Sequence, residues 1–248
     1  MFINRLLLML LVFTVGIPSV NAGWADYLDK LKSSVVTPEA VTSSTGLTNS
    51  EMIAGLKEAL NKGTQFAVDT LGKDGGFMHD SQVRIPIPDS LKWVDKSLRT
   101  LRQDKLADEF VATLNRAAEQ AAPEAAAIFG EAIQAMSVED AKAILSGPDD
   151  AATRYFRKHT EAALTKKLRP IVEQATEKAG VTSSYKRMMA KAGGLSPYLS
   201  RDVTDMDGYV TGKTLDGLFL KIAEEEKKIR ENPMERSSEL IRKVFGAQ

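Results

Sequence analysis

Cysteine is absent from the 248 residues, and histidine occurs only twice, at His79 and His159. Without cysteine the chain can form no disulfide, no thiolate nucleophile, no iron–sulfur cluster and no cysteine zinc site. Neither histidine has another one nearby in sequence, so a Ser-His-Asp arrangement or a histidine metal site would need distant partners. We therefore expect no metal and no cofactor, and we interpret His159 as a core or boundary residue of a helix.

An excess of charge of one sign is also lacking, because 33 basic side chains balance 33 acidic ones. Proteins dedicated to nucleic acids usually carry a basic excess, so no nucleic-acid partner is expected. The hydrophobic fraction of 43% and the charged fraction of 27% are those of an ordinary globular protein. These values exclude a disordered or collagen-like chain.

The N-terminus carries an unbroken apolar run of ten residues, Leu6 to Val15, with Arg5 directly before it. Small residues follow at Val20-Asn21-Ala22, where a signal peptidase needs them. The pattern predicts a secretory signal peptide at residues 1–22, cleaved after Ala22, and a periplasmic location. The run is too short to cross a bilayer as a stable helix, so no transmembrane helix is expected after cleavage. An uncleaved N-terminal anchor is the alternative.

Residues 23–47 are expected to form a mobile segment. Residues 34–46 are small and polar, which is typical of a linker. We predict a single helical domain over residues 48–248. The start of the mobile segment is amphipathic, with apolar side chains at helical spacing: Trp24, Tyr27, Leu28 and Leu31.

The first long helix has a clear start signal. Thr48 and Glu51 form a capping box, and apolar residues follow at helical spacing as far as Leu71. Gly55 and Gly63, two turns apart, would let a neighbouring helix approach closely. We therefore predict a helix that begins at Thr48 and lies against another helix.

Residues 73–88 form the one region whose sequence excludes a helix. Asp74-Gly75-Gly76 is typical of a turn, and Pro86 and Pro88 force the residues before them into extended geometry. Apolar side chains alternate over 83–87, which is compatible with a short strand-like segment. No other segment looks like a partner for such a strand.

The rest of the chain is predicted to be helical, with short connections, as in a bundle. Seven of the eleven residues from Ala117 to Ala127 are alanine, which favours a central helix that Pro123 breaks or kinks. Ser137 with Asp140 predicts another helix start. Further boundaries are expected at Gly147-Pro148, at an N-cap Asp149, at Pro170, Gly180, Gly193 and Pro197, and at two final helices over 215–230 and 233–244, the second capped by Asn232.

Two short motifs resemble ligand-binding loops but lack essential parts. Residues 208–214 are one residue short of a phosphate-binding loop and follow no strand, so we interpret them as a helix start capped by Thr211 or Thr214. Asp205 and Asp207 occupy the third and fifth positions of a calcium loop whose first and twelfth ligands are missing. We interpret these carboxylates as caps of a turn or helix.

A polar cluster lies beside the alanine-rich stretch and consists of Asn115, Arg116 and Glu119. A central helix would bury these groups and pair them, so we expect a structural pair between Arg116 and Glu119 rather than a catalytic one. Near the C-terminus, acidic residues precede basic ones at the stabilising i,i+4 spacing. The spacing predicts the ion pairs Glu224–Lys228 and Glu226–Arg230.

Residues 154–169 hold six basic side chains and one acidic side chain, Glu161. One interpretation is a patch that binds anionic lipid headgroups, lipopolysaccharide or the acidic face of another protein. The other interpretation, favoured by the neutral net charge, is a solvated helix face. The basic residues are Arg154, Arg157, Lys158, Lys166, Lys167 and Arg169.

Several stretches are long enough to compare with a known family: GLKEAL (55–60), RIPIPDSL (84–91), NRAAEQAAPEAAAIF (115–129), DAKAIL (140–145), DDAATRYF (149–156), DGLFLKIAEEEKKIRENP (216–233) and KVFG (243–246). They resemble the exported bacterial family called domain of unknown function 4197. The resemblance implies an α-helical exported protein of Gram-negative bacteria, and it carries over no catalytic residue because that family has no established activity. The matching polar positions, taken as candidates for a shared binding surface, are Asn115, Arg116, Glu119, Asp149, Asp150, Arg154, Tyr155, Glu225, Arg230 and Asn232.

Two classes of function stay open. We favour a non-enzymatic binding or interaction module of the periplasm, because no motif supports recognised catalytic machinery. Its sharper version is a carrier of an apolar ligand, since nine methionines and many alanines in a helical body could enclose a cavity. An envelope protein or a lipid is the partner considered. The alternative is a carboxylate-dependent hydrolase that acts on an envelope component through Glu119 or Asp150. The sequence does not indicate the oligomeric state.

Overall fold

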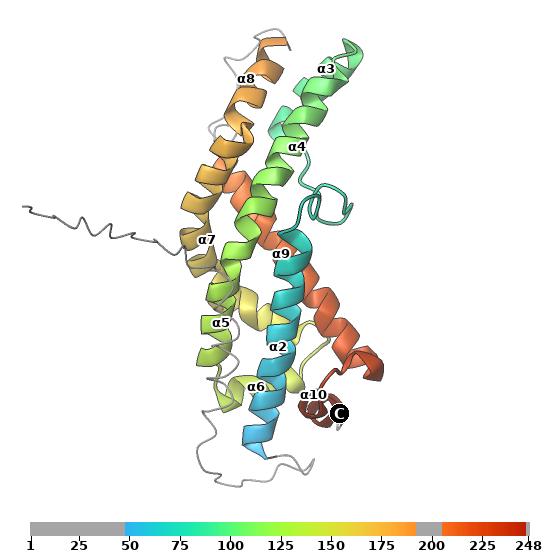
Figure 1. Cartoon of the computed structure of the whole chain (residues 1–248), viewed down its shortest axis with the longest axis vertical. Coiled ribbons are helices and arrows are strands. Elements are labelled where there is room, and N and C mark those ends of the chain that lie inside the picture. The colour runs from blue at the N-terminus through green and yellow to red at the C-terminus, as the bar shows by residue number, and fades with distance from the viewer. Residues whose placement is uncertain (1–47, 192–204, 247–248) are drawn as a thin grey trace, which may run out of the picture. The chain divides into compact units, whose positions relative to one another are not determined.

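The computed structural model describes residues 48–191 and 205–246, and within these ranges the chain is helical apart from its turns and loops (Figure 1). The prediction of an all-α fold is therefore confirmed. The predicted signal peptide, the segment that follows it, and the predicted helix ends at Gly193 and Pro197 lie outside the described residues.

The α-helices in chain order are α2 (Asn49–Leu71), α3 (Lys92–Thr100), α4 (Asp104–Ala121), α5 (Ala125–Ala135), α6 (Val138–Leu145), α7 (Ala151–Ala179), α8 (Val181–Lys191), α9 (Met206–Glu231) and α10 (Glu239–Gly246). Short 3-10 helices are η2 (Asp89–Leu91), η3 (Ala122–Glu124) and η5 (Pro233–Glu235).

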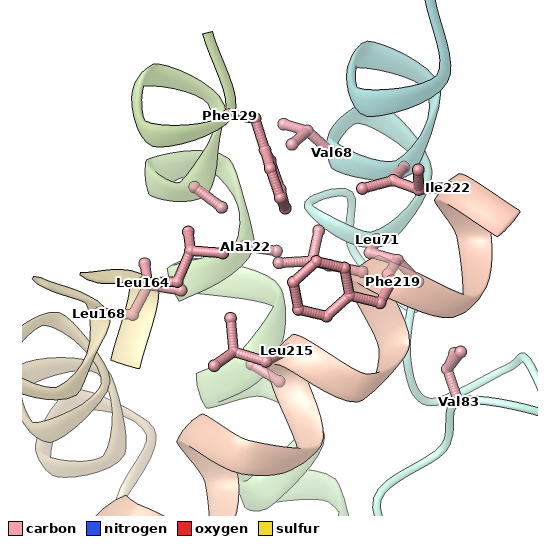
Figure 2. Packing of buried hydrophobic residues seen from close by; sticks show 14 of the residues in the cluster. Val68, Leu71, Val83, Ala122, Phe129, Leu164, Leu168, Leu215, Phe219 and Ile222 are labelled. Atoms are coloured by element: carbon pink, nitrogen blue, oxygen red, sulfur yellow. The ribbon is translucent and has the colours of Figure 1, made fainter. Parts of the chain in front are cut away.

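Aromatic residues join three helices in the core. Helix α9 packs against α2 and α7, and α4 packs along α7. Figure 2 shows Phe219 of α9 facing Phe129 of α5, with Val68 and Leu71 of α2 beside them. The two phenylalanine rings lie 5.9 Å apart at 80° between their planes, the edge-to-face geometry that aromatic pairs prefer. Phe129 meets Phe156 of α7 in the same way, at 6.0 Å, so one cluster links α5, α7 and α9.

Close packing at the centre depends on alanine, as the sequence predicts. Helix α4 ends at Ala121, Pro123 lies in η3, and α5 starts at Ala125, so the expected break at Pro123 is confirmed. Small side chains let the neighbouring helices approach closely there. The fully buried alanines of this stretch are Ala117, Ala118, Ala121, Ala122 and Ala125.

Helix starts whose caps lie close in sequence are confirmed. Thr48 and Glu51 form the capping box of α2, and Ser137 and Asp140 form that of α6. Gly180 ends α7 in the left-handed conformation, with φ of 78°, which glycine adopts at little cost.

The prediction that Pro170 ends a helix is wrong, because α7 continues through it for 29 residues in all. Proline removes one backbone donor and disfavours a helix interior. Leu164, Leu168 and Val172 lie on either side of it and are completely buried, with α7 packed along α4. Tertiary packing therefore outweighs the local preference of proline.

The last helices begin elsewhere than predicted. Helix α9 starts at Met206 rather than at residue 215, and the Asp205 carboxylate caps it by accepting the Gly208 N–H at 2.8 Å. Thr211 and Thr214 do not cap; each hydroxyl donates to the carbonyl four residues earlier inside the helix. The interpretation of Asp205 as a cap is confirmed.

Helix α10 starts at Glu239, later than the predicted 233, because the 3-10 helix η5 comes first. Asn232 caps that turn as expected, since its side chain accepts the Met234 N–H at 3.0 Å. Gly55 allows α10 to cross α2, because a Cβ added there would lie 2.9 Å from the Leu240 carbonyl oxygen.

The 72–88 loop connects α2 to η2 and contains no helix, as predicted. No strand forms anywhere in the described ranges, so the strand-like stretch finds no partner. The loop lies on α9 at Gly217, where an added Cβ would come within 2.7 Å of the Phe77 ring and 3.4 Å of Val83. Glycine at 217 thus lets irregular backbone sit directly on a helix.

Candidate functional site

Asn115 and Glu119 of α4 hold the 72–88 loop from beneath. The Glu119 carboxylate accepts the backbone N–H groups of Phe77 and Met78 at 3.0 and 3.1 Å. The Asn115 side chain accepts the N–H of Ile85 at 2.8 Å and donates to the Ile85 carbonyl at 2.9 Å. Both side chains are buried. Besides the turn hydrogen bonds within the loop, side chains of α4 therefore satisfy the backbone groups of Phe77, Met78 and Ile85.

The expected pair between Arg116 and Glu119 does not form. Arg116 points to the exposed side of α4, and no partner for its side chain occurs in the described ranges. Residues three apart on a helix share a face only approximately, and here the boundary of the core falls between them. The Glu119 charge is instead balanced by two backbone donors.

Two further contacts hold the loop against α9. The Tyr209 hydroxyl donates to the Pro86 carbonyl at 3.0 Å, and burial raises the pKa of Tyr209 to about 12. Lys221, almost fully buried, forms a 2.8 Å ion pair with Asp80. The hydrogen bond from Lys221 lowers the pKa of Asp80, and the Gln82 N–H adds to this effect. Burial alone lowers the pKa of Lys221, but hydrogen bonds to Asp80 and Glu224 outweigh it and raise that pKa.

Glu226 of α9 caps α7 from a distance. Its carboxylate accepts the N–H groups of Ala152 and Thr153, both at 2.9 Å, and the Thr153 hydroxyl at 2.8 Å. Arg230 completes the network with a 2.9 Å ion pair to Glu226, as the i,i+4 spacing predicts. Both charged side chains are under 10% exposed. An anion at a helix N-terminus is favoured by the free N–H groups there.

The prediction that Asp149 caps α7 is wrong. The N-cap position is Asp150, whose side chain bonds Arg154 at 2.8 Å instead of the helix backbone. Glu226 occupies the place that a local cap would take. Sequence reasoning missed this role, although Glu226 lies at helical spacing within the buried row Phe219, Ile222 and Ile229. A glutamate in an apolar row is the signal that could have revealed it.

The other candidates lie in separate environments. The Tyr155 hydroxyl donates to Asp140 at 3.2 Å, and the His159 ring lies 4.4 Å from the Tyr155 ring on the exposed side of α7. Burial, and then the nearby Asp140 charge, raise the pKa of Tyr155. Buried Glu225 forms ion pairs with Lys62 at 3.3 Å and with Lys228 at 3.5 Å. The predicted pair Glu224–Lys228 is therefore replaced by shorter-spaced ones, since Glu224 bonds Lys221.

A surface groove lies where the 72–88 loop meets α7 and α9; we name it the α7–α9 groove. Its volume is about 370 Å³. The loop contributes one wall, α7 a second and α9 the floor. The loop residues are Gln82, Val83, Arg84 and Pro86, the α7 residues are Thr153 and Arg157, and the α9 residues are Lys213, Asp216, Gly217, Phe219, Leu220 and Ala223.

The buried glutamates described above position this groove. Glu119 and Asn115 hold the backbone of the loop wall, and Glu226 bonds Thr153, which itself lines the groove. Asn115 and Glu119, which the sequence analysis placed on a binding surface, are thus buried residues that hold the backbone of a groove wall. The lining residues themselves carry no motif, because they come from three segments far apart in the chain.

Most of the basic stretch 154–169 is ion-paired. Arg154, Arg157, Lys167 and Arg169 pair with Asp150, Asp216, Glu131 and Asp205 respectively. Lys158 and Lys166 are exposed and have no side-chain partner in the part of the chain that the structure describes. Among the basic residues of the stretch, only Arg157 lines the groove.

Hydrogen bonds from lysine side chains or from backbone N–H groups lower the carboxyl pKa of Glu51, Asp80, Asp89, Asp140 and Asp205. The Glu119 carboxylate accepts hydrogen bonds from backbone N–H groups, and the Asp150 carboxylate accepts one from Arg154. Within the described ranges no three His, Asp or Glu side chains gather as a metal site, and no helix is both long and apolar enough to span a bilayer.

In a comparison with protein families, the model described as "Protein of unknown function (DUF4197)" matches residues 46–246. The chain belongs to this family. The DUF4197 match starts just before α2, ends at the last residue of α10 and includes every groove residue. Comparisons with curated proteins and with solved structures give no significant match.

Proposed function

We propose that this DUF4197 protein is a non-enzymatic binding protein of the Gram-negative periplasm that holds a small ligand in the α7–α9 groove. The signal-peptide pattern at residues 1–22 supports the location. The observation that carries the binding role is a groove of about 370 Å³ whose lining combines apolar side chains with three cationic ones. Sites for small molecules have volumes of roughly 300–1,000 Å³ and combine apolar surface with a few polar groups.

One cavity between helices is much smaller than the groove. A cavity between α2, α9 and α10, lined by Leu56, Gly63, Ile229 and Phe245 among others, has a volume of about 10 Å³. That volume holds about one water molecule. We therefore place the ligand of the predicted carrier in the open groove rather than in an enclosed cavity.

Native mass spectrometry of the protein purified gently from the periplasm tests the proposal. We expect a stoichiometric extra mass on the wild-type chain and loss of that mass in Leu220→Glu, which puts a charge on the groove floor. Leu220 is 37% exposed, so the fold should tolerate the change. Leu101→Glu is the matched control, because Leu101 is 57% exposed and does not line the groove. A bare wild-type mass, or an extra mass kept by Leu220→Glu, would overturn the proposal.

A further inference from the structure

The charge of the α7–α9 groove is unbalanced. Arg84, Arg157 and Lys213 line it, against a single carboxylate, Asp216. Asp216 is already engaged, because Arg157 bonds its Oδ1 at 3.2 Å and Lys213 lies 3.9 Å from its Oδ2. Arg84 is exposed and its side chain has no partner among residues 48–191 and 205–246. An incoming anion would therefore meet an uncommitted guanidinium.

Apolar side chains line the groove next to these charged groups. The Arg157 guanidinium stacks 4.6 Å above the ring of buried Phe219, which holds this cation beside the apolar lining. Among the apolar lining residues, Leu220 of α9 has more than a third of its surface exposed, and Pro86 of the loop is also exposed. Covering this water-exposed apolar surface with an apolar chain is favourable, because it removes apolar surface from water.

The size of the groove favours a small molecule over a protein as its ligand. A stable protein partner buries about 1,200 Å² or more of total surface, which needs an extended face rather than a confined hollow. A volume of about 370 Å³ instead fits one small molecule. The arrangement therefore calls for a small ligand with one charged end and one apolar end.

We infer that the groove binds an anionic headgroup, a carboxylate or a phosphate, carried on an acyl or alkyl chain. The inference rests on the proposed function and names its ligand class. Arg84 bonds the headgroup, with Lys213 and Arg157 beside it, and the chain lies over the exposed apolar residues Leu220 and Pro86. Guanidinium groups suit both headgroups, because their paired N–H donors match two oxygens of a carboxylate or phosphate.

Isothermal titration calorimetry of the purified protein with four probes tests the inference. The probes are decanoate, decyl phosphate, the uncharged decan-1-ol and inorganic phosphate. We expect at least one of the two charged amphiphiles to bind about tenfold or more tightly than decan-1-ol and inorganic phosphate, because each lacks one half of the contacts. The stronger of the charged probes identifies the headgroup. Equal binding of decan-1-ol, or binding of inorganic phosphate alone, would overturn the inference.

Three variants locate the binding site. Arg84→Gln should weaken the charged amphiphile about tenfold and leave decan-1-ol unchanged, and Leu220→Glu should weaken both. Lys166→Gln, the matched control on the exposed face of α7, should bind like the wild type. An Arg84→Gln affinity equal to that of Lys166→Gln would contradict the role of Arg84.

Failure of the inference is distinguishable from failure of the proposed function. If decan-1-ol binds as well as decanoate, and only Leu220→Glu abolishes binding, the groove is a site for a neutral apolar ligand. That result would support the proposed binding function and contradict the inference that the ligand carries an anionic headgroup. A bare native mass together with no binding of any probe would remove both.

Discussion

A buried glutamate from a distant helix holds each of two regions: Glu119 holds the loop wall of the groove, and Glu226 holds the first turn of α7. The two carboxylates differ in the partners that stabilise their negative charge. Glu119 accepts two backbone N–H groups of the loop and forms no ion pair in the described ranges. Glu226 accepts two backbone N–H groups and a hydroxyl at the start of α7, and it also pairs with buried Arg230. Neutral donors suffice at the loop, whereas the helix start includes a buried ion pair.

This difference predicts how much each carboxylate matters. Removing one partner of a buried ion pair leaves an uncompensated charge, whereas removing an acceptor from neutral donors leaves only unsatisfied amides. The α7 end should therefore be the more sensitive of the two, and the four changes below test that order.

The largest loss of stability is expected for Glu226→Ala. The change leaves the Arg230 charge buried and uncaps α7, so the free energy of unfolding should fall by about 3–5 kcal/mol. Urea unfolding followed by circular dichroism measures it. Glu231→Ala, which removes an exposed pair with Lys227, is the control and should change stability by about 0.5 kcal/mol or less. A Glu226→Ala loss no larger than that of the control would break the comparison.

The next effect is expected for Glu119→Ala, at about 2–4 kcal/mol, because two backbone N–H groups lose their acceptor. Glu119→Gln keeps an amide oxygen at the same place and should restore most of this stability. Glu226→Gln should not restore stability to the same extent, since the Arg230 guanidinium needs a negatively charged partner. Gln120→Ala, at the exposed neighbouring position, is the control. Equal rescue by glutamine at both sites would show that Arg230 plays no special part.

A smaller effect, with a distinct pH dependence, is expected at the edge of the loop for Asp80→Asn. The fold lowers the pKa of Asp80, chiefly through Lys221. The ion pair therefore stabilises the fold above the unfolded pKa of about 4 and is lost as the pH falls through the lower folded pKa. Asp80→Asn should cost about 1 kcal/mol at neutral pH and nothing once Asp80 is protonated in the wild type. A difference between the two proteins that does not change with pH would contradict this origin.

The smallest effect is expected for Asp150→Ala. Asp150 occupies the N-cap position of α7, but its side chain bonds exposed Arg154 rather than the backbone. The loss of an exposed pair should cost about 0.5 kcal/mol or less. A thermal unfolding curve compared with that of Glu226→Ala measures the contrast. A loss typical of a true cap, about 1 kcal/mol or more, would show that Asp150 shares the role given to Glu226.

Signals that act within one helical turn could be predicted from the sequence. The capping boxes at Thr48 and Ser137, the break at Pro123 and the exclusion of helix from the 72–88 loop are all confirmed. In each case the residue and its partner lie within about four positions, or the residue restricts its own backbone. The physical cause is contained in the local sequence.

Three predictions failed because the deciding contacts lie far away in the sequence. Asp149 looked like the cap of α7 because the true cap, Glu226, is 74 residues from Ala152. Arg116 looked like the partner of Glu119 because Phe77, whose N–H group takes that place, is 42 residues distant. Pro170 looked like a helix end because the packing of α7 along α4 cannot be seen locally.

The sequence by itself determined that this DUF4197 chain is helical, where several of its helices start and stop, and which segment must remain irregular, because those features depend on hydrogen bonds and backbone limits between near neighbours. Only the tertiary structure decided which carboxylates are buried, which basic residues are paired and where the groove lies. Those outcomes depend on which distant groups share a place from which water is excluded, and a buried charge takes whatever donors the packing of the helices brings to it.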